Sequence, residues 1–311
     1  MSTSHAFEVL AQTAARERAM LGVIPPQTLQ RRRRALVLEE IRASAALAGA
    51  RLGLAEVIAL VERGVAAGSH PLLEYIVTAD YADAARYVER AIMPGSKHPY
   101  LRVNEIIELH ARATRRTAQT PGRWRTTTLP PFPDGMVPPP PWLLQIEICA
   151  FTNRLASGPT PGLSPLLWVA QAHERFERIH PFSSGNGRVG RLIANLLLHR
   201  TGFPPFAVRD RDVERYLAAL RSADSQNLWP LATMIARSVV ASLLRLSYDE
   251  SQATLRSLAT FATGSERQAL YKAAQRGRLR TARGERGLQT TQAWIDAYRA
   301  SRSQRAHALL S

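Results

Sequence analysis

The sequence predicts an all-α protein, built as a helical bundle with a β-hairpin-like flap and a small C-terminal module. Apolar residues recur at spacings of three and four through long stretches, and the strict alternation typical of strands is scarce. The length of 311 residues leaves room for the appended module. A hydrophobic fraction of 45% with 21% charged residues is typical of globular proteins, which excludes a wholly disordered or fibrous chain.

Three helices are expected in the first third of the chain. Apolar residues from Leu52 onward share one face of a helix that should end at Gly64. A second helix is expected between His70 and Ala91, and a third over Val103–Ala113. In each segment the apolar face is expected to point into the core.

Prolines interrupt the helical pattern in residues 120–142. We expect an ordered flap here, with a short extended arm near Thr126, because Trp124, Phe132 and Trp142 are too apolar for a solvated tether. A polyproline linker is the alternative interpretation.

The helical pattern resumes near Trp142. Ser164 then places a capping hydroxyl before Pro165 at a first helical position, which predicts a helix that runs to about Ile179. Another apolar helical pattern follows over residues 192–198. The segment between these two helices carries the most unusual sequence in the protein.

Cysteine usage and hydropathy restrict the cellular setting. Cys149 is the only cysteine, which excludes an intrachain disulfide and a zinc site with two thiolates from one chain. The first residues lack the features of a secretory signal, and no uncharged apolar run approaches the roughly 18 residues that span a bilayer. We therefore expect a cytoplasmic protein without membrane contact.

The net charge of +16 comes almost entirely from arginine, because Lys97 and Lys272 are the only lysines. Arginine offers a planar fork of donors that matches phosphate oxygens, so phosphate-rich partners are favoured. Residues 251–311 hold 11 basic and three acidic residues, which is half of the net charge in about a fifth of the chain. This asymmetry predicts a separate C-terminal functional unit.

The string HPFSSGNGRVGR, which runs from His180 to Arg191, combines several groups that can handle phosphates. Gly185 and Gly187 allow successive backbone amides to form an anion nest, and the N-terminus of the following helix adds positive potential. Arg188 and Arg191 share a helix face and can clamp a polyphosphate, while His180 can act as a base toward a hydroxyl. The alternative is a helix end, a glycine turn and two solvated arginines.

The complete string closely resembles the signature of the Fic (Fido) family, and the resemblance extends over about Ile41 to Leu246. It implies an all-helical Fic fold that transfers part of a nucleotide, usually AMP from ATP, to a Ser, Thr or Tyr hydroxyl of a protein. By this resemblance His180 is the catalytic base and Phe182 anchors the loop in the core. The nucleotide-binding and phosphate-binding residues would be Gly185, Asn186, Gly187, Arg188 and Arg191.

Two positions depart from the family pattern. Ser184 stands where the family has the Asp or Glu that holds magnesium, and a neutral oxygen is a weaker ligand for a hard dication. Magnesium affinity and the rate of transfer are therefore expected to fall. Ser44, Ala48 and Gly49 resemble the family's inhibitory segment at the start of a helix, with Ala48 replacing the glutamate that pairs with Arg191. A small-residue packing surface is the alternative for this segment.

The resemblance also covers the flap, where Arg123, Trp124 and Arg125 look like the family's target-docking residues. A target protein with a Ser, Thr or Tyr hydroxyl is the partner that this implies.

The basic C-terminal segment is expected to form a helix up to Gly277, an arm with a tight turn, and a further helix that carries Trp294 and Tyr298. It resembles the helix-turn-helix or winged-helix modules that some Fic proteins carry at their C-termini. DNA-binding residues would be Arg276, Arg278, Arg280 and Arg283, each neutralising a phosphate from an exposed arm. Docking to a protein is the alternative.

These observations divide the chain into an N-terminal helical region, a Fic core and a basic module. The expected ranges are 1–100 with the inhibitory-like segment near 44–49, 101–246 with the flap 120–142 and the loop 180–191, and 247–311. We expect an adenylyltransferase with ATP as substrate, and a homodimer is compatible with the sequence. The rival hypothesis is an impaired nucleotide-binding protein that acts as a DNA-binding regulator. Transfer of UMP, phosphate or phosphocholine also stays open.

Overall fold

The computed structural model describes residues 3–91, 100–132, 135–247, 253–254, 264–284, 287–290, 294–295 and 298–299. The chain divides into two compact units, residues 1–247 and residues 248–311. The residues expected to form a separate N-terminal region thus pack in the same unit as the following helices.

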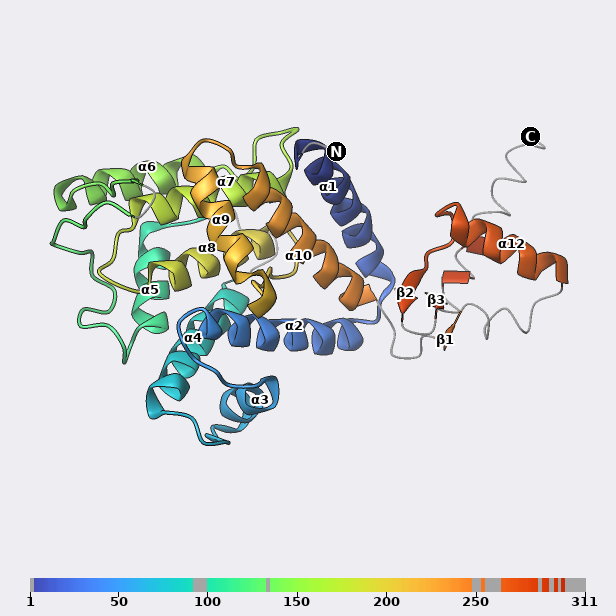
Figure 1. Cartoon of the computed structure of the whole chain (residues 1–311), viewed down its shortest axis with the longest axis horizontal. Helices are drawn as coiled ribbons and strands as arrows, with labels where there is room; N and C mark the ends of the chain where they lie inside the picture. Colours follow the sequence, from blue (N-terminus) through green and yellow to red (C-terminus); the bar gives the residue numbers. More distant parts are fainter. Residues whose placement is uncertain are drawn as a thin grey trace. The chain divides into compact units, whose positions relative to one another are not determined.

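The first unit is helical (Figure 1). Its α-helices are α1 (Thr3–Ala19), α2 (Pro26–Ala46), α3 (Leu54–Arg63), α4 (Leu72–Arg90), α5 (Val103–Ala113), α6 (Leu144–Ala156), α7 (Pro165–Ile179), α8 (Asn186–Arg200), α9 (Val213–Asp224) and α10 (Trp229–Ser247). Short 3-10 turns occupy Met20–Val23, Pro141–Leu143 and Asp210–Asp212. The predicted all-α class is confirmed.

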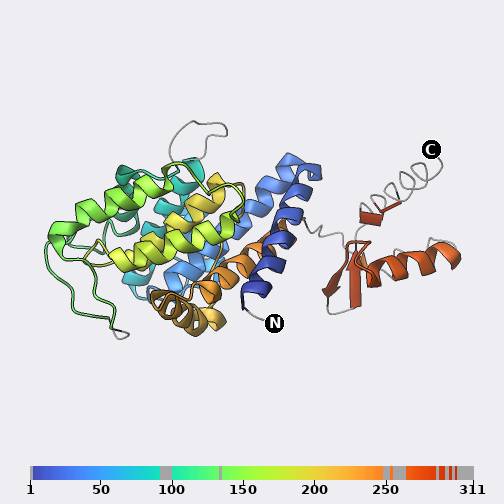
Figure 2. The same cartoon turned by 90° about the horizontal axis from the view of Figure 1, so that it is seen from above.

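Helix α8 lies at the centre of this unit (Figures 1 and 2). It packs against α7, α5, α4 and α2, and its middle is formed by buried apolar residues from Leu192 to Leu198. The N-terminus of α8 can therefore be reached by side chains from α2, α5 and α7, which is where the candidate site lies.

Local capping signals predicted several helix boundaries correctly. The third expected helix and the helix after Ser164 have the predicted ends. The Ser164 hydroxyl accepts a hydrogen bond from the backbone N–H of Leu166 at 3.3 Å, and Gly64 ends α3 in the left-handed conformation. These boundaries could be predicted because they depend on neighbours in the sequence.

The inhibitory-like segment lies at the end of a helix, so its expected place at a helix start is wrong. Ser44 belongs to the last turn of α2, and Ala48 and Gly49 follow in an exposed turn. The helix begins at Pro26, a favourable first residue, and continues through a run of helix-forming residues. Gly49, at a φ of 94°, reverses the chain after it.

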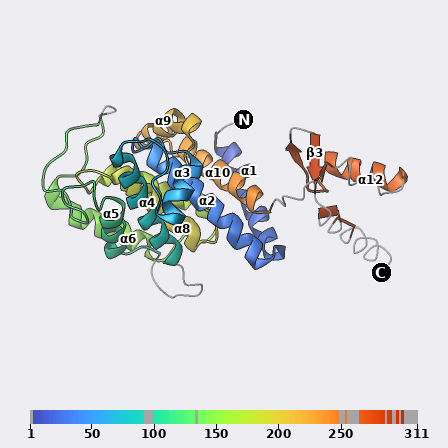
Figure 3. The ribbon, with the colours of Figure 1, turned by 90° about the horizontal axis from the view of Figure 1, so that it is seen from below.

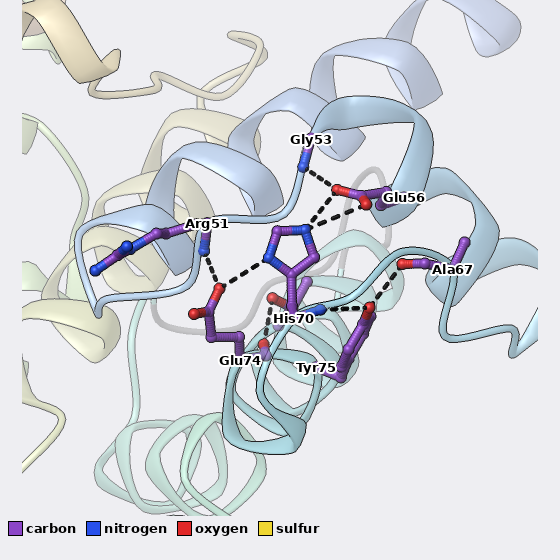
Figure 4. Close-up of polar contacts among 8 residues, drawn as sticks. Arg51, Gly53, Glu56, Ala67, His70, Glu74 and Tyr75 are labelled. Carbon is purple, nitrogen blue, oxygen red and sulfur yellow. Dashed lines mark hydrogen bonds and ion pairs between the residues drawn. The ribbon is translucent and has the colours of Figure 1, made fainter.

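The corner between α3 and α4 is held by a polar cluster around His70 (Figure 4). The His70 Nε2 atom lies 3.0 Å from a carboxylate oxygen of Glu56, and its Nδ1 atom lies 3.5 Å from Glu74. The backbone N–H groups of Gly53 and Arg51 donate to the same two carboxylates. The cluster thus ties the chain that follows α2 to the beginnings of α3 and α4.

The flap differs from the expected hairpin. Among its described residues, 120–132 and 135–142, no strand is present, and the backbone N–H of Phe132 donates to the carbonyl of Met136 at 2.8 Å. Because the flanking prolines have no N–H to donate, a strand ladder cannot form there. Figure 3 shows the described parts of this loop extending beyond the helices.

Helix α10 is the one helix of the described residues that is long and apolar enough to cross a membrane. This is weak evidence, because 61% of its most apolar 18-residue window is buried inside the protein. The helix packs against α1, α7 and α9, as a core helix does.

The second unit combines α12 (Gly264–Gln275) with the strands β1 (Ala253–Thr254), β2 (Ala282–Gly284) and β3 (Gly287–Thr290). The strands form an antiparallel sheet in the order β1-β3-β2, so the expected arm and tight turn are a hairpin of β2 and β3. Leu270, Ala273, Leu279, Trp294 and Ile295 form a small core. No helix-turn-helix is established by the described residues of this unit.

Candidate nucleotide-binding loop and catalytic base

The loop between α7 and α8 is bounded by two residues in the left-handed conformation, His180 at a φ of 46° and Gly185 at a φ of 80°. A Cβ atom at position 185 would lie 2.6 Å from the Cγ2 atom of Thr114. The chain therefore needs glycine here both for the backbone angle and for the close approach of α5.

Asn186 shapes this loop from inside. Its Oδ1 atom accepts the backbone N–H of Phe182 at 2.9 Å, and its Nδ2 atom donates to the carbonyl of Phe182 at 2.8 Å. The Asn186 amide group thus closes the loop across four residues, so this side chain shapes the loop. Phe182 is completely buried, as expected for a core anchor.

His110 on α5 is a structural residue of the loop that the sequence analysis missed. Its ring stacks on Phe182 with 3.6 Å between centroids. The backbone N–H of Gly122 donates to Nδ1 at 2.8 Å, so the proton belongs on Nε2, which donates to the carbonyl of Ser184 at 3.0 Å. Burial lowers the pKa of His110 to about 4. Its place on the apolar face of the predicted helix, three residues after Ile107, was the available signal.

His180 has a different environment. Its Nδ1 atom lies 3.3 Å from the carbonyl of Glu177, which can only accept, so the proton belongs on Nδ1 and Nε2 keeps a lone pair. Burial lowers the pKa of His180, and the nearby Arg125 lowers it further. The imidazole is therefore neutral at pH 7 and able to accept a proton. The ring of Phe132 from the flap packs edge-on against it at 4.9 Å.

Arg188 and Arg191 both come from the first turns of α8, as predicted, and both are engaged with the protein. Arg188 donates to the carbonyl of Ala113 at 2.8 Å and to the hydroxyl of Thr117 at 3.3 Å. Arg191 is only 5% exposed, and its Nε atom donates to the hydroxyl of Ser44 at 2.6 Å. The structure thus brings Ser44 to the second arginine, whereas Ala48 and Gly49 lie exposed in the turn that follows.

Two buried carboxylates accompany Arg191, and the sequence analysis missed both. Burial raises the pKa of Glu40 on α2 and that of Glu177 on α7 to about 7, while the charge of Arg191 opposes the shift in each case. The Glu40 carboxylate also accepts the hydroxyl of Tyr81 at 2.5 Å. No local pattern marks these residues, because their proximity depends on the packing of α2 and α7 against α8.

The three candidate docking residues have different roles in the structure. Arg125 is buried, and its backbone N–H and Nε atom donate to the carbonyls of Pro181 and His180, each at 2.9 Å. Trp124 is half-buried, with its ring 4.8 Å from that of Phe182. Only Arg123 is exposed. Arg125 therefore fastens the flap to the loop. It is not available to dock a target, in contrast to the expectation from the sequence.

The residues present do not form a protein-held magnesium site. The side chain of Ser184 is exposed, and its hydroxyl is the neutral oxygen that replaces a carboxylate. Within the ranges described above, no group of three His, Cys, Asp or Glu side chains could hold a metal ion.

In the second unit, Arg276 and Arg278 are exposed, whereas the guanidinium of Arg280 lies 4.3 Å from the centre of the Trp294 ring. The expected place of Arg280 in an exposed arm is therefore wrong, because a cation above an indole face is stabilised there. The side chain of Arg283 lies outside the described residues. DNA binding by this unit stays a prediction.

The site thus combines a neutral histidine at the end of α7 with two arginines at the start of α8, where the helix N-terminus favours an anion. Residues 100–198, from before α5 into α8, match the Fic/DOC family. The chain therefore carries a Fic/DOC domain over these residues, which confirms the predicted resemblance.

The protein adenylyltransferase Fic of Nematostella vectensis is 31% identical over 224 residues, which are 71% of this chain and 52% of that protein. The protein of the same name from Culex quinquefasciatus is 26% identical, covering 67% of this chain and 41% of that protein. The chain thus spans about half the length of these relatives.

Solved structures show the same fold. The structure of Fic-1 from C. elegans matches with a TM-score of 0.70 and 23% identity, covering 78% of this chain and 72% of that one. A Fic family protein from Desulfovibrio desulfuricans has a TM-score of 0.61 and 20% identity, covering 91% of this chain and 95% of that one.

Proposed function

We propose that this chain is a Fic-type adenylyltransferase that moves AMP from ATP to a Ser, Thr or Tyr hydroxyl of a target protein. The observation that carries the proposal is the Nδ1 contact of His180 with the Glu177 carbonyl, which leaves Nε2 as the proton acceptor at the start of the α7–α8 loop, with Arg188 and Arg191 in the first turns of α8. The names of the relatives, which are protein adenylyltransferases, support the same reaction.

In the proposed reaction the ATP phosphates bind to the backbone amides at the start of α8. The target hydroxyl oxygen attacks the α-phosphorus, and its proton passes to Nε2 of His180. The bond between the α-phosphorus and the oxygen that bridges to the β-phosphate breaks, and pyrophosphate leaves. Arg188 and Arg191 stabilise the charge on the leaving group after exchanging their protein acceptors for phosphate oxygens.

The rival function is nucleotide binding without turnover. Two observations favour it: Ser184 offers no carboxylate, and the hydrogen bonds of Arg191 to Ser44 must break before that arginine can bind phosphate. The absence of any transfer together with retained ATP binding would select this alternative.

His180→Ala tests the proposal. With radiolabelled ATP and cell lysate, we expect this substitution to lower label transfer by about 100- to 10,000-fold, the usual contribution of a general base. His5→Ala is the control, because His5 is an exposed residue of α1 at a distance in sequence and structure from the loop. Transfer that persists in His180→Ala would refute the assigned base.

A further inference from the structure

A cavity rich in arginine, the α9–α10 cavity, lies between α9, α10 and the chain that leads from Phe206 into α9. Its volume of about 710 Å³ falls in the range of small-molecule sites. Buried apolar side chains, including those of Phe206, Val208 and Ala219, form part of its wall. None of its lining residues belongs to the loop at His180.

The charge of this cavity is unbalanced. Four arginines line it, Arg209, Arg211, Arg215 and Arg237, and Asp212 is the only acidic residue among the lining residues. Arg211 and Arg215 share that carboxylate at 3.8 Å and 3.5 Å. In the part of the chain that the structure describes, Arg209 and Arg237 have no acidic partner.

The neighbouring cavity extends the same surface. It shares Arg209 and Arg211 with the α9–α10 cavity. Its other two arginines, Arg42 and Arg245, form ion pairs with Asp210 and Glu39, so their charges are neutralised. The unbalanced positive charge is therefore concentrated at the α9–α10 cavity and not spread evenly over this face. Such a concave site favours an anion because its arginines can direct several donors toward one ligand.

We propose that this cavity binds a small polyphosphate with an apolar body, in the chemical class of nucleoside polyphosphates. The arginines would bind the phosphates, and the apolar wall would cover the body of the ligand. The concave shape favours a small ligand over a nucleic acid duplex, which would lie on an extended surface. The site is separate from the loop that carries the proposed transferase reaction.

The test uses the full chain and an ATP analogue with a fluorescent N-methylanthraniloyl group. Because this probe is also expected at the loop, binding is measured in the Arg188→Ala protein, with inorganic tripolyphosphate as competitor. We expect a saturable site that tripolyphosphate displaces. Adding Arg215→Ala and Arg237→Ala should weaken binding at least about tenfold, since each removes a charge-assisted contact.

Arg221→Ala is the matched control, because Arg221 is an exposed arginine of α9 that does not line the cavity. The proposal is overturned if Arg188→Ala leaves no site, or if the double substitution weakens binding no more than the control does. It is also overturned if a short DNA duplex displaces the probe at a lower concentration than tripolyphosphate, which would assign the arginines to nucleic acid. Label transfer is measured separately on a protein that carries only Arg215→Ala and Arg237→Ala, and it reports whether the His180 site is intact.

Discussion

His110 and His180 lie at the same loop, one in the last turn of α5 and the other at the end of α7. Both are neutral because burial lowers their pKa values. Their hydrogen bonds differ: among the described residues, both ring nitrogens of His110 are bonded to the backbone, while for His180 only Nδ1 has such a bond. Two histidines at the same glycine loop can therefore have different functions.

A histidine whose two ring nitrogens both form hydrogen bonds therefore supports the structure of a site, as a brace. A histidine with a free lone pair can accept a proton. His110 fixes the carbonyl of Ser184 and the backbone of Gly122, so it joins the loop to the flap. His180 is held by one bond, which orients the ring without occupying the nitrogen that would accept a proton. The following predictions, ordered from the largest expected effect, test this distinction.

The brace is tested by His110→Ala. The substitution removes the ring stacked on Phe182 and leaves the Gly122 N–H and the Ser184 carbonyl without their partner. We expect the free energy of unfolding to fall by about 3 kcal/mol, from the cavity and the unsatisfied groups together. Urea denaturation measures this, with His180→Ala as the comparison. An equal loss of unfolding free energy in the two variants would contradict the distinction between a structural His110 and a catalytic His180.

The same residue predicts a pH dependence. Unfolded histidine titrates near a pKa of about 6.5, whereas the pKa of His110 in the fold is about 4. Between these values the unfolded state binds the extra proton, so this group costs the native protein stability as the pH falls from 6.5 to 4. His110→Gln removes that cost. The free energy of unfolding of His110→Gln, measured by urea denaturation, is expected to be lower than that of the native protein, and this difference should become smaller as the pH falls from 6.5 to 4.

Ser184→Asp tests the residue that contacts His110 through its backbone and is expected at the metal through its side chain. His110 holds the backbone carbonyl of Ser184, so the exposed side chain can change without loss of the brace. A carboxylate restores a hard ligand, and we expect label transfer to rise about tenfold with magnesium. Ser183→Asp is the matched control at the exposed neighbour. Equal rates for both variants across a magnesium titration would show that residue 184 is not at the metal.

Ala48→Glu tests whether an added carboxylate can pair with Arg191 and keep it from binding phosphate, while both histidines stay unchanged. Ala48 is exposed in the turn that follows α2, four residues after Ser44, which already accepts a hydrogen bond from Arg191. A glutamate there can pair with Arg191, so we expect transfer to fall several-fold with little change in stability. Ala48→Gln, similar in size but uncharged, should keep the native rate. Matching rates for the two variants would mean that the charge does not reach Arg191.

His70 provides a third histidine far from the loop in sequence. It is partly exposed and paired with Glu56 and Glu74 (Figure 4). Exposed ion pairs contribute about 0 to 1 kcal/mol, so we expect His70→Ala to lower the free energy of unfolding by less than about 1 kcal/mol. Thermal and urea denaturation measure the change. A loss as large as that of His110→Ala would show that burial does not set the difference between these histidines.

The sequence predicted the parts of the site that depend on local chemistry. The Ser164-Pro165 cap, the end of α7 and the glycines ahead of α8 are contiguous signals, and the fold and family follow from them. Glu40 and Glu177 come from elements that only tertiary packing brings to Arg191, so no spacing marked them. For His110 the spacing indicated a buried position, but its contact with the loop also depends on tertiary packing. Arg125 was misplaced for the same reason, because its carbonyl partners lie partly in a distant loop.

The proposed reaction moves AMP from ATP to a protein hydroxyl with His180 as the base, and the fate of each phosphate of ATP tests it most directly. The native protein is incubated in parallel with ATP labelled at the α-phosphate and with ATP labelled at the γ-phosphate, each with the same target preparation. We predict protein-bound label from the α-position only, and its loss in His180→Ala. Protein-bound label from the γ-position, or no transfer from either position, would contradict the account.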